Sequence, residues 1–426
     1  MMPVSIGRPD ETGRREERAR RRPASATAAG LQRRPDRKPS RRNTQVRRNA
    51  LVLAWIVVAA VLAVLIIAGP LASWGTWLPL HALLLGGIGS AITVWSAHFA
   101  DTLLHRPALG GAALLDARLY AHGAGTALVL VGITASWPVV AIAGVTIIVL
   151  AALTGVVAIS VQYRRAVAPR LAALAIHYAV ALMLLALGAV FGYLTNWAEA
   201  RGSTHLSDVF YVAHTTTMVL GFVGTTVLGT LTVLWPTMLR TRMEPEAPRW
   251  TGRGLPLLVT GTALIASSGL LAALAVPGTI VYLAGACGVV VPAVRTARRV
   301  PPTSFATASA AAAVIWFLIG VVRIGTGIGV SALGDAGAME QAAAAREVIH
   351  GVRVLLAAGF ALQVLAGALS YLSPVMLGGG PAATRATNAI MDRAAAYRVV
   401  AANACLALAL LTVLPWEVRV SGAVTA

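Results

Sequence analysis

Long apolar runs follow one another along this chain from Leu51 to Trp416. Each has about 18 or more residues, the length that an α-helix needs to cross the roughly 30 Å hydrocarbon core of a membrane. The alternating pattern of a membrane β-barrel is absent. Because backbone groups in lipid must be satisfied within their own segment, we expect helices. The expected spans lie near residues 51–69, 78–98, 119–136, 138–161, 171–195, 208–238, 255–275, 277–294, 303–330, 347–377 and 397–416.

This pattern predicts an all-α, polytopic integral membrane bundle of about 11 spans (11–12) over residues 51–416. Composition agrees, since 57% of the 426 residues are hydrophobic and only 12% are charged, with a mean hydropathy of +0.75. A water-soluble fold of this length would not normally carry that balance. The lipid bilayer is therefore the expected surrounding of the chain.

The net charge of +19 gathers at the N-terminus and does not point to nucleic acid. Residues 1–50 hold 15 Lys and Arg against 5 Asp and Glu, which is +10 of the total. The segment has few large apolar residues, so we expect a disordered, basic, cytoplasmic tail. Its expected partner is the anionic inner leaflet, at roughly 1 kcal/mol for each basic residue near the surface. We expect no nucleic-acid partner.

The loops between the expected spans set the orientation. With the tail inside, four of the five inner loops are clearly basic and the outer loops carry few cations. This agrees with the positive-inside rule and predicts a multi-pass protein of the plasma membrane with a cytoplasmic N-terminus. The C-terminus is then extracellular or periplasmic, and residues 417–426 form a short outer-face tail. Tryptophans fall at the expected outer boundary, as in an aromatic belt, at Trp74, Trp77, Trp137, Trp197 and Trp416.

An internal repeat relates three parts of the chain. Residues 221–239 read GFVGTTVLGTLTVLWPTML and residues 359–377 read GFALQVLAGALSYLSPVML, 138 residues later. A histidine precedes each of these blocks, His214 and His350. Residues 81–97 (HALLLGGIGSAITVWSA) also begin with a histidine and contain glycines, but lack the proline. The interval from one repeated segment to the next covers four expected helices. The pattern therefore predicts three parallel four-helix units around a pseudo-threefold axis. Pro236 and Pro374, at matching positions, are expected to bend or end their helices.

One histidine occupies a matching place in each unit: His81, His214 and His350. Ionisable residues inside spans are costly, so they are functional candidates. Imidazole at this depth suits an axial bond to haem iron or a bond to copper. The alternative interpretation is structural: each imidazole ring only forms a hydrogen bond to a neighbouring backbone carbonyl. Nearby, Arg323 and Arg353 are candidates to hold haem propionates, or else reach to the outer headgroups.

The remaining chemistry-bearing residues give weaker signals. A second site from four further histidines is conceivable, but a structural role is favoured. The two cysteines lie in apolar runs and predict neither a disulfide framework nor a thiolate metal cluster. These residues are His98, His105, His122 and His177, and Cys287 and Cys405.

The four-helix period and its histidines resemble subunit I of haem-copper oxidases. The chain resembles more closely the NnrS-type membrane proteins and the membrane domain that precedes cupredoxin domains in actinobacterial copper nitrite reductase or multicopper oxidase proteins. Three segments carry the likeness, LPLHALLLGGIGSAITVWSAHFADTLL, AHTTTMVLGFVGTTVLGTLTVLWP and HGVRVLLAAGFALQVLAGALSYLSPVMLGGGP. The resemblance implies that His81 and His350 match haem-ligand positions and that His214 matches a copper-ligand region.

The resemblance implies haem b and copper as cofactors, and electron transfer or the handling of nitric oxide, nitrite or copper as the function. An oxidoreductase component fits, but a complete oxygen-reducing centre does not. The seventh expected helix lacks a His-His pair, and the tenth has one histidine where oxidases have His-x-His. We expect a separate cupredoxin or cytochrome as redox partner at the outer face.

Two other functions stay open. One is a transporter or channel for a small solute, with repeat glycines such as Gly224 and Gly367 lining the path. The other is a membrane enzyme acting on an isoprenoid lipid, although the sequence contains no acidic metal cluster that would support it.

Overall fold

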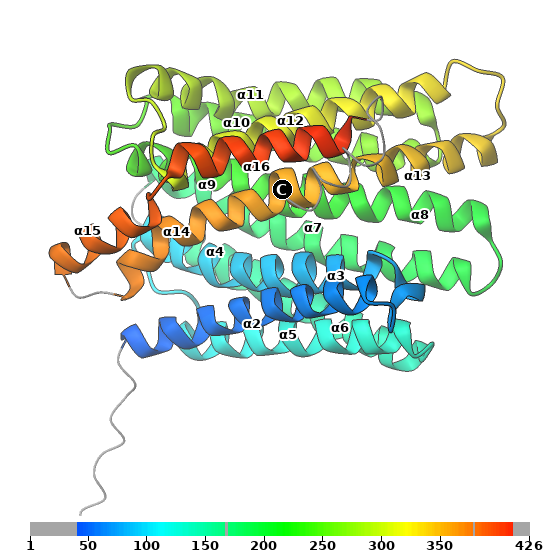
Figure 1. Ribbon diagram of the computed structural model, residues 1–426, viewed down its shortest axis with the longest axis horizontal. Helices are drawn as coiled ribbons and strands as arrows, with labels where there is room; N and C mark the ends of the chain where they lie inside the picture. Colours follow the sequence, from blue (N-terminus) through cyan, green and yellow to red (C-terminus); the bar gives the residue numbers. More distant parts are fainter. Residues whose placement is uncertain (1–40, 167–168, 378–379, 412–426) are drawn as a thin grey trace, which may run out of the picture. The chain divides into compact units, whose positions relative to one another are not determined.

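The computed structural model describes residues 41–166, 169–377 and 380–411. The chain divides into two units, Met1–Arg41 and Arg42–Ala426, and the fold below is that of the second unit. Its described residues form helices and no β-strand, which confirms the all-α class, and most of the helices run side by side (Figure 1). The α-helices are α2 (Arg41–Ile67), α3 (Trp77–His81), α4 (Gly89–Leu104), α5 (Gly111–Thr134), α6 (Pro138–Arg164), α7 (Pro169–Glu199), α8 (Thr204–Thr216), α9 (Thr225–Met238), α10 (Ala247–Ala266), α11 (Ala275–Arg299), α12 (Phe305–Ser331), α13 (Ala338–Val354), α14 (Gln363–Leu377), α15 (Gly380–Met391) and α16 (Ala395–Leu410).

Eight helical segments of the described residues are long and apolar enough to cross a membrane, and the bent pair of α15 and α16 brings the number to nine. The multi-pass membrane character is therefore supported. The expected count was about 11. The difference lies in α5 and α10, which have 24 and 20 residues but carry charged residues in their first halves, at Asp116 and Arg118 and at Arg249 and Arg253.

Several boundaries differ from those expected. Helix α2 begins at Arg41, so residues 41–50 are helical and not part of a disordered tail. Contacts with α5 explain the difference, because Arg48 Nε and Arg47 Nη2 bind the Asp116 carboxylate at 2.7 and 3.0 Å. Helix α13 extends into the expected outer loop 331–346, and α15 lies in the expected inner loop 378–398. Residues 1–40 of the expected tail, Trp416 and residues 417–426 lie outside the described residues.

The three repeat helices share an unusual feature, a π-helical segment that follows the histidine. These segments are η2 (Ala82–Ile88), η3 (Thr217–Gly224) and η6 (Leu355–Leu362), and they are the π-helices of the described residues. They end 136 and 138 residues apart, from Ile88 to Gly224 and from Gly224 to Leu362. π-Helices are rare and occur mostly at functional positions. Their recurrence means that the repeat extends to backbone geometry.

Two helical hairpins also match. Helix α5 packs against α6, and α10 packs against α11. In each hairpin two glycines bring the backbones together: a Cβ on Gly125 would lie 2.8 Å from the Gly144 carbonyl oxygen, and one on Gly254 would lie 2.5 Å from that of Gly285. Small residues allow such close approach of membrane helices. The expected effect of the first proline is also present, since α9 ends at Met238, two residues after Pro236.

Candidate histidine site

Two of the three repeat histidines meet in space. His81 is the last residue of α3 and His214 lies near the end of α8. Their imidazole rings are parallel within 5°, and their centres are 6.2 Å apart. The contact joins the first repeat unit to the second, although 133 residues separate the two histidines in sequence.

The same ring nitrogen is held in both histidines. Nδ1 of His81 lies 2.8 Å from the Trp77 carbonyl oxygen, and Nδ1 of His214 lies 2.8 Å from the Gly188 carbonyl oxygen. A carbonyl oxygen only accepts, so each Nδ1 must donate a proton. In a neutral imidazole the other nitrogen, Nε2, then carries the lone pair. Metal-binding histidines are typically oriented in this way by a bond from the second nitrogen.

Neighbouring residues shape the space around these rings. The Trp77 indole lies against the His81 ring, with centres 4.4 Å apart and planes inclined at 30°. On α7, Gly192 leaves room for the His214 ring, because a Cβ there would lie 2.8 Å from both Cε1 and Nδ1 of that ring. Gly188, one turn earlier, supplies the carbonyl that holds His214. The ring of His214 therefore lies in a notch left by Gly192 and is held there by the Gly188 carbonyl.

The two rings would be the donors of a shared metal site. They are neighbours, with parallel planes and ring centres 6.2 Å apart, and each would offer its Nε2 nitrogen to the metal. Neutral imidazole is a ligand for copper and for haem iron. The donor set therefore fits both groups that the resemblance implies.

His350 lies elsewhere. Its ring contacts Tyr211, with centres 4.9 Å apart and planes at 71°. Among the described residues no three His, Cys, Asp or Glu side chains form a group that could hold a metal ion. Arg323 and Arg353 are exposed, on α12 and α13, and no described contact joins either to the histidine pair. The structure thus brings together two of the three predicted metal ligands.

The other histidines are dispersed. Nε2 of the buried His122 lies 2.8 Å from the carbonyl oxygen of Leu85, in η2, which is the kind of structural role that the sequence favours. His177 is buried beside Gly229. His98 and His105 are exposed at the far end of α4.

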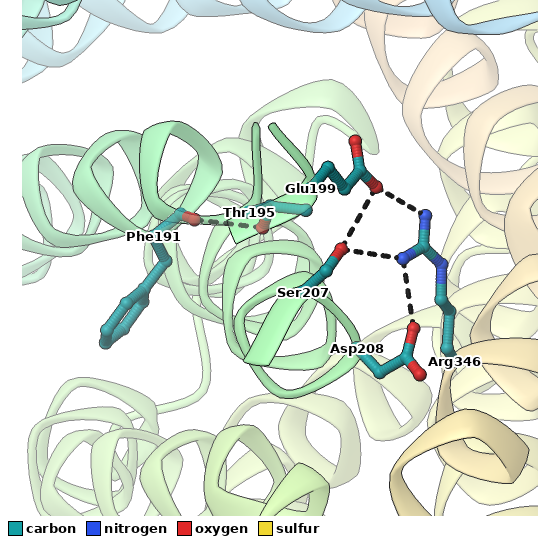
Figure 2. A network of polar contacts seen from close by, with 6 residues as sticks. All are labelled: Phe191, Thr195, Glu199, Ser207, Asp208 and Arg346. Atoms are coloured by element: carbon teal, nitrogen blue, oxygen red, sulfur yellow. Dashed lines mark hydrogen bonds and ion pairs between the residues drawn. The ribbon is translucent and has the colours of Figure 1, made fainter. Parts of the chain in front are cut away.

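A polar network near His350 was not predicted from the sequence. Figure 2 shows the Arg346 guanidinium of α13 between the end of α7 and the start of α8. Its Nη1 donates to Ser207 Oγ and Asp208 Oδ1, and its Nη2 donates to Glu199 Oε1, all at 3.0 Å. Ser207 Oγ also donates to Glu199 Oε1 at 3.0 Å. The same guanidinium lies 4.7 Å from the centre of the Tyr211 ring.

This network, Glu199–Ser207–Asp208–Arg346, ties the second repeat unit to the third. One signal in the sequence could have revealed it: the expected outer loops 196–208 and 331–346 carry charges of opposite sign at Asp208 and Arg346. The assignment of both loops as irregular segments hid their proximity.

The repeat glycines that were expected to line a transport path contact other parts of the protein. A Cβ on Gly224 would lie 2.7 Å from Phe317 Cζ and from the Tyr282 hydroxyl. One on Gly367 would lie 3.0 Å from the Ala306 carbonyl oxygen. These two glycines therefore serve close packing between helices.

Comparison of the chain with protein-family models finds no match, and comparison with curated proteins finds none either.

Proposed function

We propose that this chain is a membrane protein that holds haem iron or copper between His81 and His214 and serves electron transfer, in the handling of nitric oxide, nitrite or copper. The observation that carries the proposal is the parallel pair of rings 6.2 Å apart, each with Nδ1 held by a backbone carbonyl. The expected alternative, in which each ring only bonds a carbonyl, accounts for Nδ1 but not for the pairing of the two rings.

We also propose that α5 and α10 cross the membrane, which gives about 11 spans in three units around a pseudo-threefold axis. Matching π-helices and matching glycine-packed hairpins support this arrangement. At 1.5 Å per residue, α5 and α10 would be about 36 and 30 Å long, which is enough to span the hydrocarbon core. With the basic loops inside, the histidine pair lies near the outer face of the plasma membrane.

The residues around the pair have distinct tasks in this proposal. His81 and His214 would hold the metal, which would supply one-electron redox chemistry. The Trp77 and Gly188 carbonyls fix the imidazole tautomers, because they accept the Nδ1 protons. His350 is not a ligand in this arrangement, although the resemblance assigns it a haem-ligand position. A cupredoxin or cytochrome at the outer face remains the proposed redox partner.

The test is a reduced-minus-oxidised visible spectrum with metal analysis of the detergent-purified protein. We expect stoichiometric haem b or copper in the parent, and its loss in His81→Ala and in His214→Ala. His350→Ala is the matched control, because it removes a repeat histidine outside the pair and should retain the metal. A parent protein with neither haem nor copper would refute the proposal, and loss of metal only in His350→Ala would refute the ligand assignment.

A further inference from the structure

A continuous series of aromatic rings leads from the end of the bundle to the histidine pair. It begins at Trp74, in the short helix η1 (Ala72–Trp74) of the connection between α2 and α3. The Trp74 and Trp77 ring centres are 6.3 Å apart, and those of Trp77 and His81 are 4.4 Å apart. The 6.2 Å contact between His81 and His214 completes the series.

The series begins at an exposed end of the bundle. Trp74 is partly exposed, and its neighbours Ser73 and Gly75 are exposed. A position in the aromatic belt explains a tryptophan at this depth, but it does not explain ring contacts that lead inward. Trp137, at the turn between α5 and α6, offers a comparison: it is 58% exposed and has no described ring contact with the histidines.

We propose that Trp74 and Trp77 form the path by which single electrons pass from a water-soluble one-electron carrier to the metal held by His81 and His214. The inference rests on the proposed function of that pair. The rate of electron tunnelling falls steeply with the distance between two redox groups. The Trp74 and Trp77 rings fill most of the distance from the exposed end of the bundle to His81 with conjugated atoms.

The transfer is balanced without further reactants. The carrier loses one electron and is oxidised, and the metal gains that electron and is reduced. Neither tryptophan changes its oxidation state in the net reaction. No proton has to move, because both Nδ1 atoms keep their protons and donate them in hydrogen bonds to the Trp77 and Gly188 carbonyl oxygens.

The experiment injects electrons beside Trp74. A thiol-reactive ruthenium tris-bipyridine label is attached at Ser73→Cys in the full chain, with Cys287→Ser and Cys405→Ser to remove the native thiols. A laser flash with a sacrificial donor generates the reduced label, and reduction of the bound metal is followed at its absorption band. Metal content and midpoint potential are measured on every variant.

We expect Trp77→Leu to lower the first-order rate constant several-fold at unchanged metal content and midpoint potential. Trp77→Phe, which keeps a ring, should restore most of the rate, and Trp137→Leu should leave it unchanged. If Trp77→Leu releases the metal, Trp74→Leu serves in its place, because Trp74 contacts neither histidine. An undiminished rate in a fully loaded Leu variant would overturn this path alone, whereas a parent protein without metal would overturn the proposed function with it.

Discussion

A histidine in a membrane bundle is prepared for a metal when one ring nitrogen is held by the protein and the other is left for the ligand. His81 finds its acceptor within its own helix, at Trp77, whereas His214 finds one on a different helix, at Gly188. The orientation of the His214 ring therefore depends on how closely α7 approaches α8. Glycines on α7 permit that approach.

The first prediction concerns this notch. Gly192→Ala would place a Cβ 2.8 Å from the His214 ring, so the ring must shift. Such overpacking typically costs about 1–3 kcal/mol, and we expect weaker retention of bound metal, measured by metal analysis after dialysis. Gly351→Ala is the control, because nothing lies within 4 Å of its Cβ. Equal metal retention in the two variants would show that the notch does not orient the ring.

The π-helical segments change the hydrogen bonding of their own backbone. A π-turn pairs residues i and i+5, so a carbonyl group within it can be left for a partner from elsewhere. In η2 the Leu85 carbonyl bonds His122, and in η3 the Leu220 carbonyl accepts from the Tyr282 hydroxyl at 2.9 Å. Two neighbouring helices thus stabilise equivalent irregularities of the two units.

The second prediction removes one of these partners. Tyr282 is fully buried, so Tyr282→Phe leaves the Leu220 carbonyl without its donor inside the bundle. An unsatisfied buried acceptor costs about 1–3 kcal/mol, and the thermal midpoint of the purified protein should fall. Tyr397→Phe removes a hydroxyl from a side chain that is 77% exposed and should leave the midpoint unchanged. An equal midpoint in both variants would contradict the role assigned to Tyr282.

The third prediction concerns the hairpin of α10 and α11. Gly254→Ala would place a Cβ 2.5 Å from the Gly285 carbonyl oxygen, which is a backbone atom and cannot move aside as a side chain can. The two helices must separate, and we expect much less folded protein in detergent, measured by size-exclusion chromatography. Gly252→Ala, two residues earlier in α10, has its nearest contact at 3.8 Å and is the matched control. Similar yields of the two variants would contradict close packing of this hairpin.

The assembly of the repeat units depends on a few long-range contacts between them. The Glu199–Ser207–Asp208–Arg346 network joins partners that are 138 and 147 residues apart in sequence. It places α13 against the ends of α7 and α8. Since α8 also carries His214, the network helps to hold one wall of the histidine site.

The fourth prediction tests this connection. Arg346→Met removes three charge-assisted hydrogen bonds, and Arg346 is only partly exposed, so we expect a loss of about 1–3 kcal/mol and a lower thermal midpoint. Arg346→Lys should recover part of the loss, because an ammonium group cannot reproduce the planar fork. Arg323→Met, at an exposed arginine without a described ion pair, is the control. A midpoint unaffected by Arg346→Met would refute the contribution of the network.

The fifth prediction tests the number of spans. If α5 and α10 cross the membrane, single cysteines at Ser136 and Leu270 should react with an impermeant thiol reagent added outside intact cells, in a chain without Cys287 and Cys405. A cysteine at Arg165 should react only after the cells are opened. If Ser136→Cys is labelled only from inside, α5 does not cross, and the same result at Leu270→Cys would exclude α10.

Much of the helical plan follows from local properties of the chain. An apolar run long enough to span lipid and a proline near its end are features of neighbouring residues, so the lengths of most helices and the end of α9 could be predicted. The in-phase positions of His81 and His214 were visible in the same way. Residues 41–50 were predicted wrongly, because what makes them helical includes the bonds of Arg47 and Arg48 to Asp116 on another helix.

Which histidines form the site could not be predicted from local properties of the sequence. Three histidines at matching depths look equivalent in sequence, but whether two rings meet depends on the sideways position and rotation of each helix in the bundle. Those are set by contacts between residues more than a hundred positions apart, such as Arg346 with Glu199. Thus the chain's own order of apolar and polar residues specifies the helices, because an apolar run is a local property, whereas helix packing pairs His81 with His214 and turns His350 towards Tyr211.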